Sequence, residues 1–95
     1  MSAYFIVYLN VTDSEQFTRY FQAVMPVIER RGGRLIAQGT PEAIEGTWQF
    51  EQAVVFEWRS RQDFLNYWHS EEYAEIKQLR ERAAEFEGVL IAGDQ

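Results

Sequence analysis

The chain has no cysteine and a single histidine, His69. Without cysteine it has no disulfides, no thiolate nucleophile and no thiolate metal ligand. With one histidine, a zinc site would need carboxylates for nearly every other ligand, so we expect no metal site. No glycine-rich segment opens a helix as phosphate-binding loops do, and we expect no cofactor.

Basic residues are also few. The 95 residues include nine Lys and Arg against 15 Asp and Glu, which gives a net charge of −6. Such a chain repels nucleic acid, so no nucleic-acid partner is expected. No apolar run approaches the roughly 20 residues of a membrane span, and a strand-like pattern follows Met1 directly, without a basic leader. These features predict a cytoplasmic protein without membrane contact.

Large apolar side chains, in contrast, are abundant. Apolar residues make up 46% of the chain and aromatic residues 16%, a composition that excludes disorder. A chain of this length forms one domain with a thin core. We therefore expect residues 1–95 to form a single domain.

The hydrophobic pattern predicts the order of the elements. Alternating apolar residues indicate strands over residues 4–11, 34–39, 52–58 and 89–92. A capping box at Thr12 begins a first helix that contains Pro26 and ends at Gly32-Gly33. A second helix begins at Ser60 and breaks near Ser70. The order is that of an α+β, ferredoxin-like βαββαβ domain with a four-stranded antiparallel sheet.

The first and third strands are apolar on both faces. Two helices can cover only one face of a four-stranded sheet, so the second face needs another cover. The simplest cover is an identical subunit related by a two-fold axis, because a monomer would expose an apolar patch of several hundred Å². We expect a homodimer in which two sheets face each other.

Short motifs spread along nearly the whole chain are specific when taken together. They are Tyr20, Gly32-Gly33-Arg34, Glu45-Gly46-Thr47-Trp48, Phe56-Glu57-Trp58 followed by Ser60, and Ser70-Glu71-Glu72-Tyr73 with Arg80. In these motifs the chain resembles the uncharacterised bacterial family called domain of unknown function 1330, of the dimeric α/β-barrel superfamily. It departs from the family pattern at Phe50 and Glu71, where proline is usual, and in the run Tyr67-Trp68-His69 before Ser70. The resemblance implies a dimeric barrel and assigns no reaction.

Glu57 and His69 are the candidate catalytic residues. A carboxylate on the third strand either reaches solvent or is desolvated, and desolvation would raise its pKa toward that of a useful acid or base. The alternative is an ion pair at the dimer seam, with Arg34 or Arg80 as the counter-charge. His69 could transfer a proton near neutral pH, or be an exposed residue at the helix break, where Ser70 is better explained as a cap than as a nucleophile.

Five further residues are candidate ligand contacts. Arg34 and Arg80 could hold a carboxylate or phenolate in a fork geometry, although a surface or structural ion pair is the simpler explanation for each. The family geometry would place Tyr20, Trp48 and Tyr73 in a cleft between the helices and the sheet, whereas packing in a thin core is the simpler explanation. The acidic run Glu71, Glu72 and Glu75 is expected to be a solvated helix start.

Two functions remain open on the sequence. In the first, the dimer only binds a small molecule, or serves as an interaction module, without chemistry. In the second, it is a cofactor-independent enzyme, similar to monooxygenases or isomerases, that acts on a small aromatic or carbonyl compound. The second rests on fold analogy alone.

Overall fold

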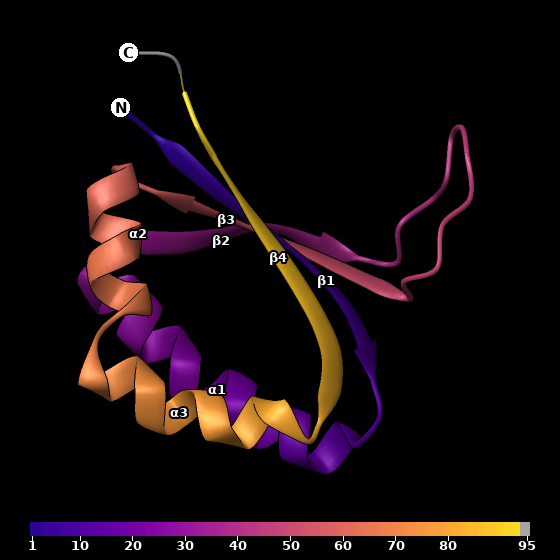
Figure 1. Ribbon diagram of the computed structural model, residues 1–95, viewed down its shortest axis with the longest axis horizontal. Coiled ribbons are helices and arrows are strands. Elements are labelled where there is room, and N and C mark those ends of the chain that lie inside the picture. The colour runs from indigo at the N-terminus through magenta and orange to yellow at the C-terminus, as the bar shows by residue number, and fades with distance from the viewer. Residues whose placement is uncertain (94–95) are drawn as a thin grey trace.

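A computed structural model describes residues 1–93 and confirms the predicted βαββαβ order, with the second helix broken in two (Figure 1). The first and third strands and the break near Ser70 lie where the pattern placed them, to within one residue. The elements are β1 (Ala3–Val11), α1 (Ser14–Arg31), β2 (Gly33–Gly39), β3 (Gln52–Trp58), α2 (Arg61–Trp68), α3 (Glu71–Glu81) and β4 (Ala84–Ala92).

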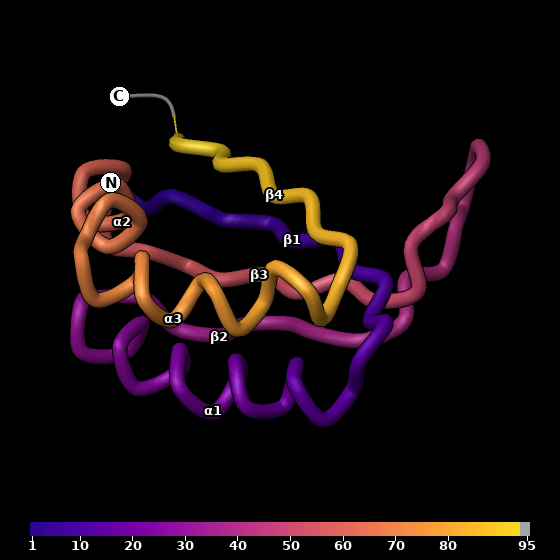
Figure 2. The backbone as a smooth tube through the Cα atoms, turned by 60° about the horizontal axis from the view of Figure 1, so that its bottom comes forward, coloured from indigo at the N-terminus to yellow at the C-terminus, as the bar shows by residue number. Residues whose placement is uncertain are grey.

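The four strands form one antiparallel sheet in the order β2-β3-β1-β4. All three helices lie on one side of it, so that the sheet has an inner face toward the helices and an outer face without them (Figures 1 and 2). Phe5 on β1 pairs with Phe56 on β3 and with Leu90 on β4. This register brings apolar side chains of three strands together on the inner face.

The hydrophobic core fills the space between the inner face and the helices. Successive strand residues point to opposite faces, and the buried positions of β1 and β3 alternate accordingly. Helix α1 presents buried residues at helical spacing toward the same space. The core members from these three elements are Ala3, Phe5, Val7, Leu9, Tyr20, Val24, Val27, Ile28, Val54, Phe56 and Trp58.

The ends of α1 follow local side-chain chemistry, with one correction. Asp13, not Thr12, is the N-cap, and its Oδ1 accepts from the backbone N–H of Gln16 at 3.1 Å. A capping side chain bonds two or three residues ahead, and Asp13 fills that role one residue after the predicted one. Pro26 does not end the helix, which continues to Arg31. Gly32 then ends it with φ of 107°, a left-handed conformation that favours glycine.

Strand β4 is longer than predicted. It begins at Ala84 rather than at residue 89, and its first half pairs with the end of β1. Glu85 and Glu87 alternate with the inward-facing Phe86, as strand residues do. The Asn10 side chain supports this pairing by donating to Glu85 Oε1 at 3.2 Å.

The outer face of the sheet is largely apolar. Tyr4, Ile6 and Tyr8 lie on this face of β1, opposite Ile91, Val89 and Glu87 of β4. Val89 and Ile91 are 47% and 54% exposed. The predicted second apolar face is therefore present, and the helices of the same chain do not cover it (Figure 2).

The connection over residues 40–51 has no regular structure and projects beyond the end of the sheet (Figure 1). It also rises on the side away from α1 (Figure 2). Trp48 and Phe50 anchor its return to the sheet against Tyr8, with ring centroids 4.9 and 5.7 Å away. Its aromatic residues thus extend the apolar outer face.

Candidate functional site

Three tyrosines from three different helices meet beneath the sheet. The hydroxyls of Tyr20 on α1 and Tyr73 on α3 lie 3.1 Å apart and share a hydrogen bond. Tyr67 on α2 packs against Tyr73 with ring centroids 4.7 Å apart. The break at His69-Ser70 makes this possible, because the Ser70 side chain caps α3 at the Tyr73 N–H and donates to the Tyr67 carbonyl at 2.7 Å. The predicted role of Ser70 as a helix cap is confirmed.

Burial holds two of these tyrosines in the protonated form. Desolvation raises the pKa of Tyr20 and of Tyr67 well above the ordinary value for a phenol, and neighbouring tyrosines raise both further. The nearby Arg80 guanidinium lowers both pKa values by less than burial raises them. Both groups are therefore neutral hydroxyls that can donate a hydrogen bond.

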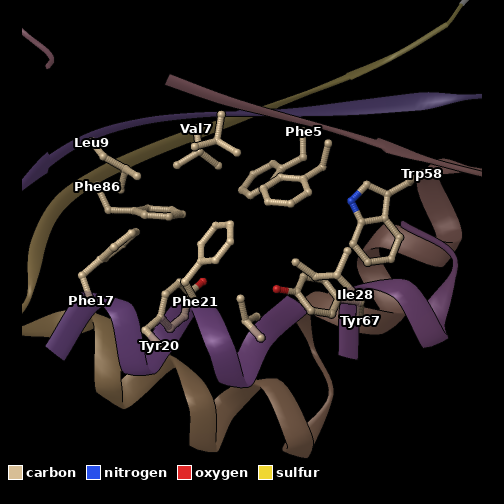
Figure 3. A pocket seen from close by; sticks show the side chains of 13 residues that line it. Phe5, Val7, Leu9, Phe17, Tyr20, Phe21, Ile28, Trp58, Tyr67 and Phe86 are labelled. Atoms are coloured by element: carbon tan, nitrogen blue, oxygen red, sulfur yellow. The ribbon is translucent and has the colours of Figure 1, made fainter. Parts of the chain in front are cut away.

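An inner cavity lies between α1 and the sheet, with aromatic and aliphatic walls from β1, β3, β4, α1 and α2. Figure 3 shows the hydroxyls of Tyr20 and Tyr67 pointing into the space among these walls. Its empty volume is about 420 Å³ with the solvent at its mouth included. The indole Nε1 of Trp58, also on the wall, is buried and has no hydrogen-bond partner among residues 1–93.

A second, wider hollow lies between β4 and the break in the second helix. We call it the outer groove, although it lies on the helix side of the sheet and not on the outer face. Its walls are Phe5, Phe64, Leu65, Trp68, His69, Arg80, Phe86, Gly88 and Leu90, and its empty volume, including open solvent, is about 840 Å³. Phe5 and Phe86 line both the groove and the inner cavity, so these two rings form the wall between them. His69 lies at the groove as an exposed residue.

Arg80 is the charged residue of this region. Only 8% of its surface is exposed, and its guanidinium carbon lies 3.7 Å from the centroid of the Phe86 ring. The sequence allowed Arg80 as a counter-charge for Glu57, and the structure corrects this. Arg80 lies at the C-terminal end of α3 on the inner side, whereas Glu57 belongs to the outer face.

Glu57 is paired with Arg34, the other predicted counter-charge. Arg34 Nε donates to Glu57 Oε1 at 2.8 Å, and the Tyr4 hydroxyl donates to Oε2 at 3.3 Å. These bonds, the one from Arg34 above all, lower the pKa of Glu57 below its ordinary value. The lowered pKa is the opposite of the desolvated, raised pKa that a catalytic role was expected to need.

Trp48 lies away from the cleft that the sequence assigned to it. Its ring is perpendicular to that of Tyr8 on the outer face, while Tyr20 and Tyr73 lie beneath the inner face. The reason is that side chains alternate along β1. Val7 and Leu9 point inward, so Tyr8 and the Trp48 ring that packs on it lie on the outer face. Of the five predicted ligand residues, the structure brings together Tyr20, Tyr73 and Arg80.

The sequence analysis missed several residues of this region. Tyr67, Trp58 and Phe86 were not proposed as site residues, although all three line the inner cavity. The alternation of side chains along β3 predicts that Trp58 points inward, and helical spacing from Phe64 predicts the same for Tyr67. Phe86 was missed because its strand was predicted too short.

The acidic start of α3 is partly an ion-pair site. Glu72 pairs with Arg30 and, at 3.2 Å, with Arg31, both on α1. The expectation of a wholly solvated helix start is therefore wrong for Glu72. Within residues 1–93 no cluster of three or more potential metal ligands occurs. No helix in that part of the chain combines the length and apolarity needed to cross a membrane.

Comparison with known proteins supports a family and a fold. The model of the family described as domain of unknown function (DUF1330) matches residues 2–94. Comparison with curated proteins finds no match. Among solved structures, RPA0582 from Rhodopseudomonas palustris, a protein of unknown function, is 17% identical with a TM-score of 0.83, over 99% of this chain and 83% of that one.

Two other solved structures are similar at lower scores. SnoaB from Streptomyces nogalater, a cofactor-independent oxygenase, is 12% identical with a TM-score of 0.70, over 99% of this chain and 94% of its own. A dimeric ferredoxin-like protein of unknown function from Thermobifida fusca is 15% identical with a TM-score of 0.66, over 98% and 92%. At these identities the likeness shows the fold alone.

Proposed function

The chain belongs to the DUF1330 family, and we propose that it is a homodimer that binds a small aromatic molecule beneath its sheet. The observation that carries the binding proposal is the pair of neutral hydroxyls, Tyr20 and Tyr67, that point into an aromatic-walled cavity (Figure 3). Ligand sites have this composition, with apolar walls and a few directed polar groups. The ligand's ring system would lie in the outer groove with its polar end toward the tyrosines.

The size of the two hollows supports this placement. The inner cavity has about half the empty volume of the groove beside it, about 420 against about 840 Å³. Entry of a ring into the inner cavity would require Phe5 or Phe86 to change rotamer, because these rings separate the two spaces. The ring would therefore stay in the groove, and only its smaller polar substituent would pass between Phe5 and Phe86 toward Tyr20 and Tyr67.

The binding proposal can be tested by measuring the affinity for 2-naphthamide with isothermal titration calorimetry. The carbonyl of this probe can accept from the phenols, so the double variant Tyr20→Phe, Tyr67→Phe should bind it at least fivefold more weakly. Tyr4→Phe is the matched control, since Tyr4 lies on the outer face and should leave the affinity unchanged. Absence of any binding to the wild type would contradict the proposal.

The homodimer part of the proposal rests on the outer face. Val89 and Ile91 are about half exposed there, and a solved relative in fold is described as dimeric. A second copy packed sheet to sheet would cover these side chains and bring the Glu57–Arg34 pair to the seam. The groove lies on the inner side of the sheet and would stay open.

Light scattering tests the dimer. The wild type should have twice the 11.2 kDa mass of one chain, and Val89→Asp should reduce the mass to that of one chain. Gln78→Asp, on the exposed side of α3, should remain dimeric. A wild-type protein that is monomeric at micromolar concentration would end this part of the proposal.

A second candidate function is cofactor-independent oxidation of an aromatic carbonyl compound. The specific observation in its favour is that Tyr20 and Tyr67 stay protonated beside the Arg80 cation, an arrangement that would stabilise an oxyanion formed on a substrate. His69, at the groove, is the predicted catalytic residue nearer to this space. Glu57 would be remote from it, and its catalytic role stays a prediction.

Oxygen uptake with anthrone as the probe tests this second function. One O₂ would oxidise the anthrone methylene to a carbonyl, with anthraquinone and water as products, so no external reductant is needed. Uptake above the uncatalysed rate that falls at least tenfold in Tyr20→Phe would support it. A rate equal to that of buffer alone would leave binding as the function.

A further inference from the structure

Arg80 is a buried cation for which the described residues supply no anionic partner. It is 8% exposed, and its Nε has no hydrogen-bond partner within the described residues. The ion pairs found in residues 1–93 involve Arg30, Arg31, Arg34 and Arg59, and none involves Arg80. Buried charges in proteins are normally paired, because removing an ion from water has a large free-energy cost.

The groups around Arg80 compensate this charge only in part. The Phe86 ring faces the guanidinium, and the carbonyl end of α3 is near because Arg80 lies in its last turn. Both interactions are weaker than a buried ion pair. Tyr20 forms a side-chain hydrogen bond with Arg80 and Tyr67 lies near it, but both phenols are neutral and so do not supply an anion.

The outer groove provides the space for a missing anion. Arg80 lines it, and no carboxylate side chain of the described residues belongs to its walls. A second cation, Lys77, lies one turn earlier on α3, with its Nζ 5.4 Å from the centroid of Trp68, another wall residue. The charge of the groove is therefore positive in a chain whose net charge is −6.

The remaining walls suit a flat apolar body. Phe64 and Trp68 are stacked at 23° with centroids 5.7 Å apart, and Phe5 meets Phe64 at 4.5 Å. Gly88 adds to the space, because a Cβ at this position would come within 2.6 Å of the Phe5 ring. A planar ring in the groove would lie against aromatic walls, and its acidic substituent would reach Arg80.

We propose that the outer groove binds an aromatic carboxylate, with the carboxylate paired to the Arg80 guanidinium and the ring against Phe64, Trp68 and Phe86. This inference rests on the proposed function, because it assigns the chemical class of the molecule that is bound there. A guanidinium presents two parallel N–H donors to the two oxygens of a carboxylate, a geometry that an amide does not match.

The test compares 2-naphthoate with 2-naphthamide, which have nearly the same shape and differ in charge. Calorimetry on the wild type should show at least tenfold tighter binding of the acid. In Arg80→Met, which keeps an apolar chain of similar length, this preference should fall below twofold. Arg82→Met, which removes an exposed arginine two residues away, should keep the tenfold preference.

A second measurement does not depend on the affinity of the variant. If Arg80 has no anionic partner in the free protein, Arg80→Met should unfold at a temperature equal to or above that of the wild type. Saturating 2-naphthoate should then raise the unfolding temperature of the wild type and leave that of Arg80→Met unchanged. A large loss of stability in the free variant would show that Arg80 is already paired, and would overturn the inference.

The outcomes separate the two proposals. Equal affinity for acid and amide, or a preference that persists in Arg80→Met, overturns the assignment of a carboxylate to Arg80 and leaves aromatic binding in place. Failure of both probes to bind the wild type overturns the proposed function together with this inference.

Discussion

The hydroxyl of Tyr20 on α1 lies 3.1 Å from the hydroxyl of Tyr73 on α3, and both residues are buried. Fifty-three positions separate them in the chain. The hydrogen bond joins the two longest helices beneath the sheet, next to the buried Arg80. Its contribution to stability can be measured separately from any ligand.

The two hydroxyls of this pair should not contribute independently to stability. Removing both should cost less than twice the free energy lost when one is removed. Tyr20→Phe and Tyr73→Phe should each lower the free energy of unfolding by about 1–3 kcal/mol, because each leaves a buried partner without its hydrogen bond. The double variant should lose less than the sum of the single losses. Urea unfolding at one fixed protein concentration measures the cycle, and strictly additive losses would contradict a direct bond.

Glu72 should make stability depend on pH in the acidic range. Its hydrogen bond from Arg30 is the first cause of a pKa below the ordinary value in the folded chain. The stabilisation is therefore present above the unfolded pKa of about 4.3 and is lost as the pH falls through the lower folded value. The difference in urea midpoint between wild type and Glu72→Gln should be largest near pH 6 and should shrink toward pH 3.

The matched control for this titration is Glu75→Gln. Glu75 lies on the same helix, is exposed, and forms no ion pair among the described residues. Its midpoint should follow that of the wild type at every pH. A constant difference between wild type and Glu72→Gln from pH 6 to pH 3 would exclude the ion pair as the cause.

Gly33 should not tolerate a side chain. A Cβ there would lie 2.7 Å from atoms of both Ile28 and Trp58, within the packed core. Gly33→Ala should therefore lower the free energy of unfolding by about 1–3 kcal/mol, a cost typical of overpacking. Gly39→Ala, at the other end of β2 with nothing within 4 Å of its Cβ, should change it by less than about 0.5 kcal/mol.

Substitution can show which of two adjacent residues, Thr12 or Asp13, caps the N-terminus of α1. Asp13→Ala removes the acceptor of the Gln16 N–H and should lower the free energy of unfolding by about 1 kcal/mol. Thr12→Ala should have a smaller effect, since Thr12 is exposed and its side chain caps nothing. The reverse order in thermal or urea unfolding would restore the capping box predicted at Thr12.

The sequence predicted the bounds of some strands correctly and missed those of others. Strand β3 was predicted with its observed bounds, because its β-branched and aromatic run lies between an irregular connection and the helix cap at Ser60. The first half of β4 was missed, since short acidic segments with one aromatic residue fit a helix end as well as a strand. The location of Trp48 was missed because the connection over residues 40–51 has no periodicity from which to infer a side.

By itself, the sequence determined the element types, their order, the helix break at Ser70 and the end of α1 at Gly32. These features depend on residues a few positions apart, through side-chain period, capping and backbone conformation. Only the tertiary structure decided that Tyr20, Tyr67, Tyr73 and Arg80 meet beneath the sheet while Glu57 and Arg34 pair on its other face. Those contacts depend on how α3 lies against α1 and on strand register, which no local pattern contains.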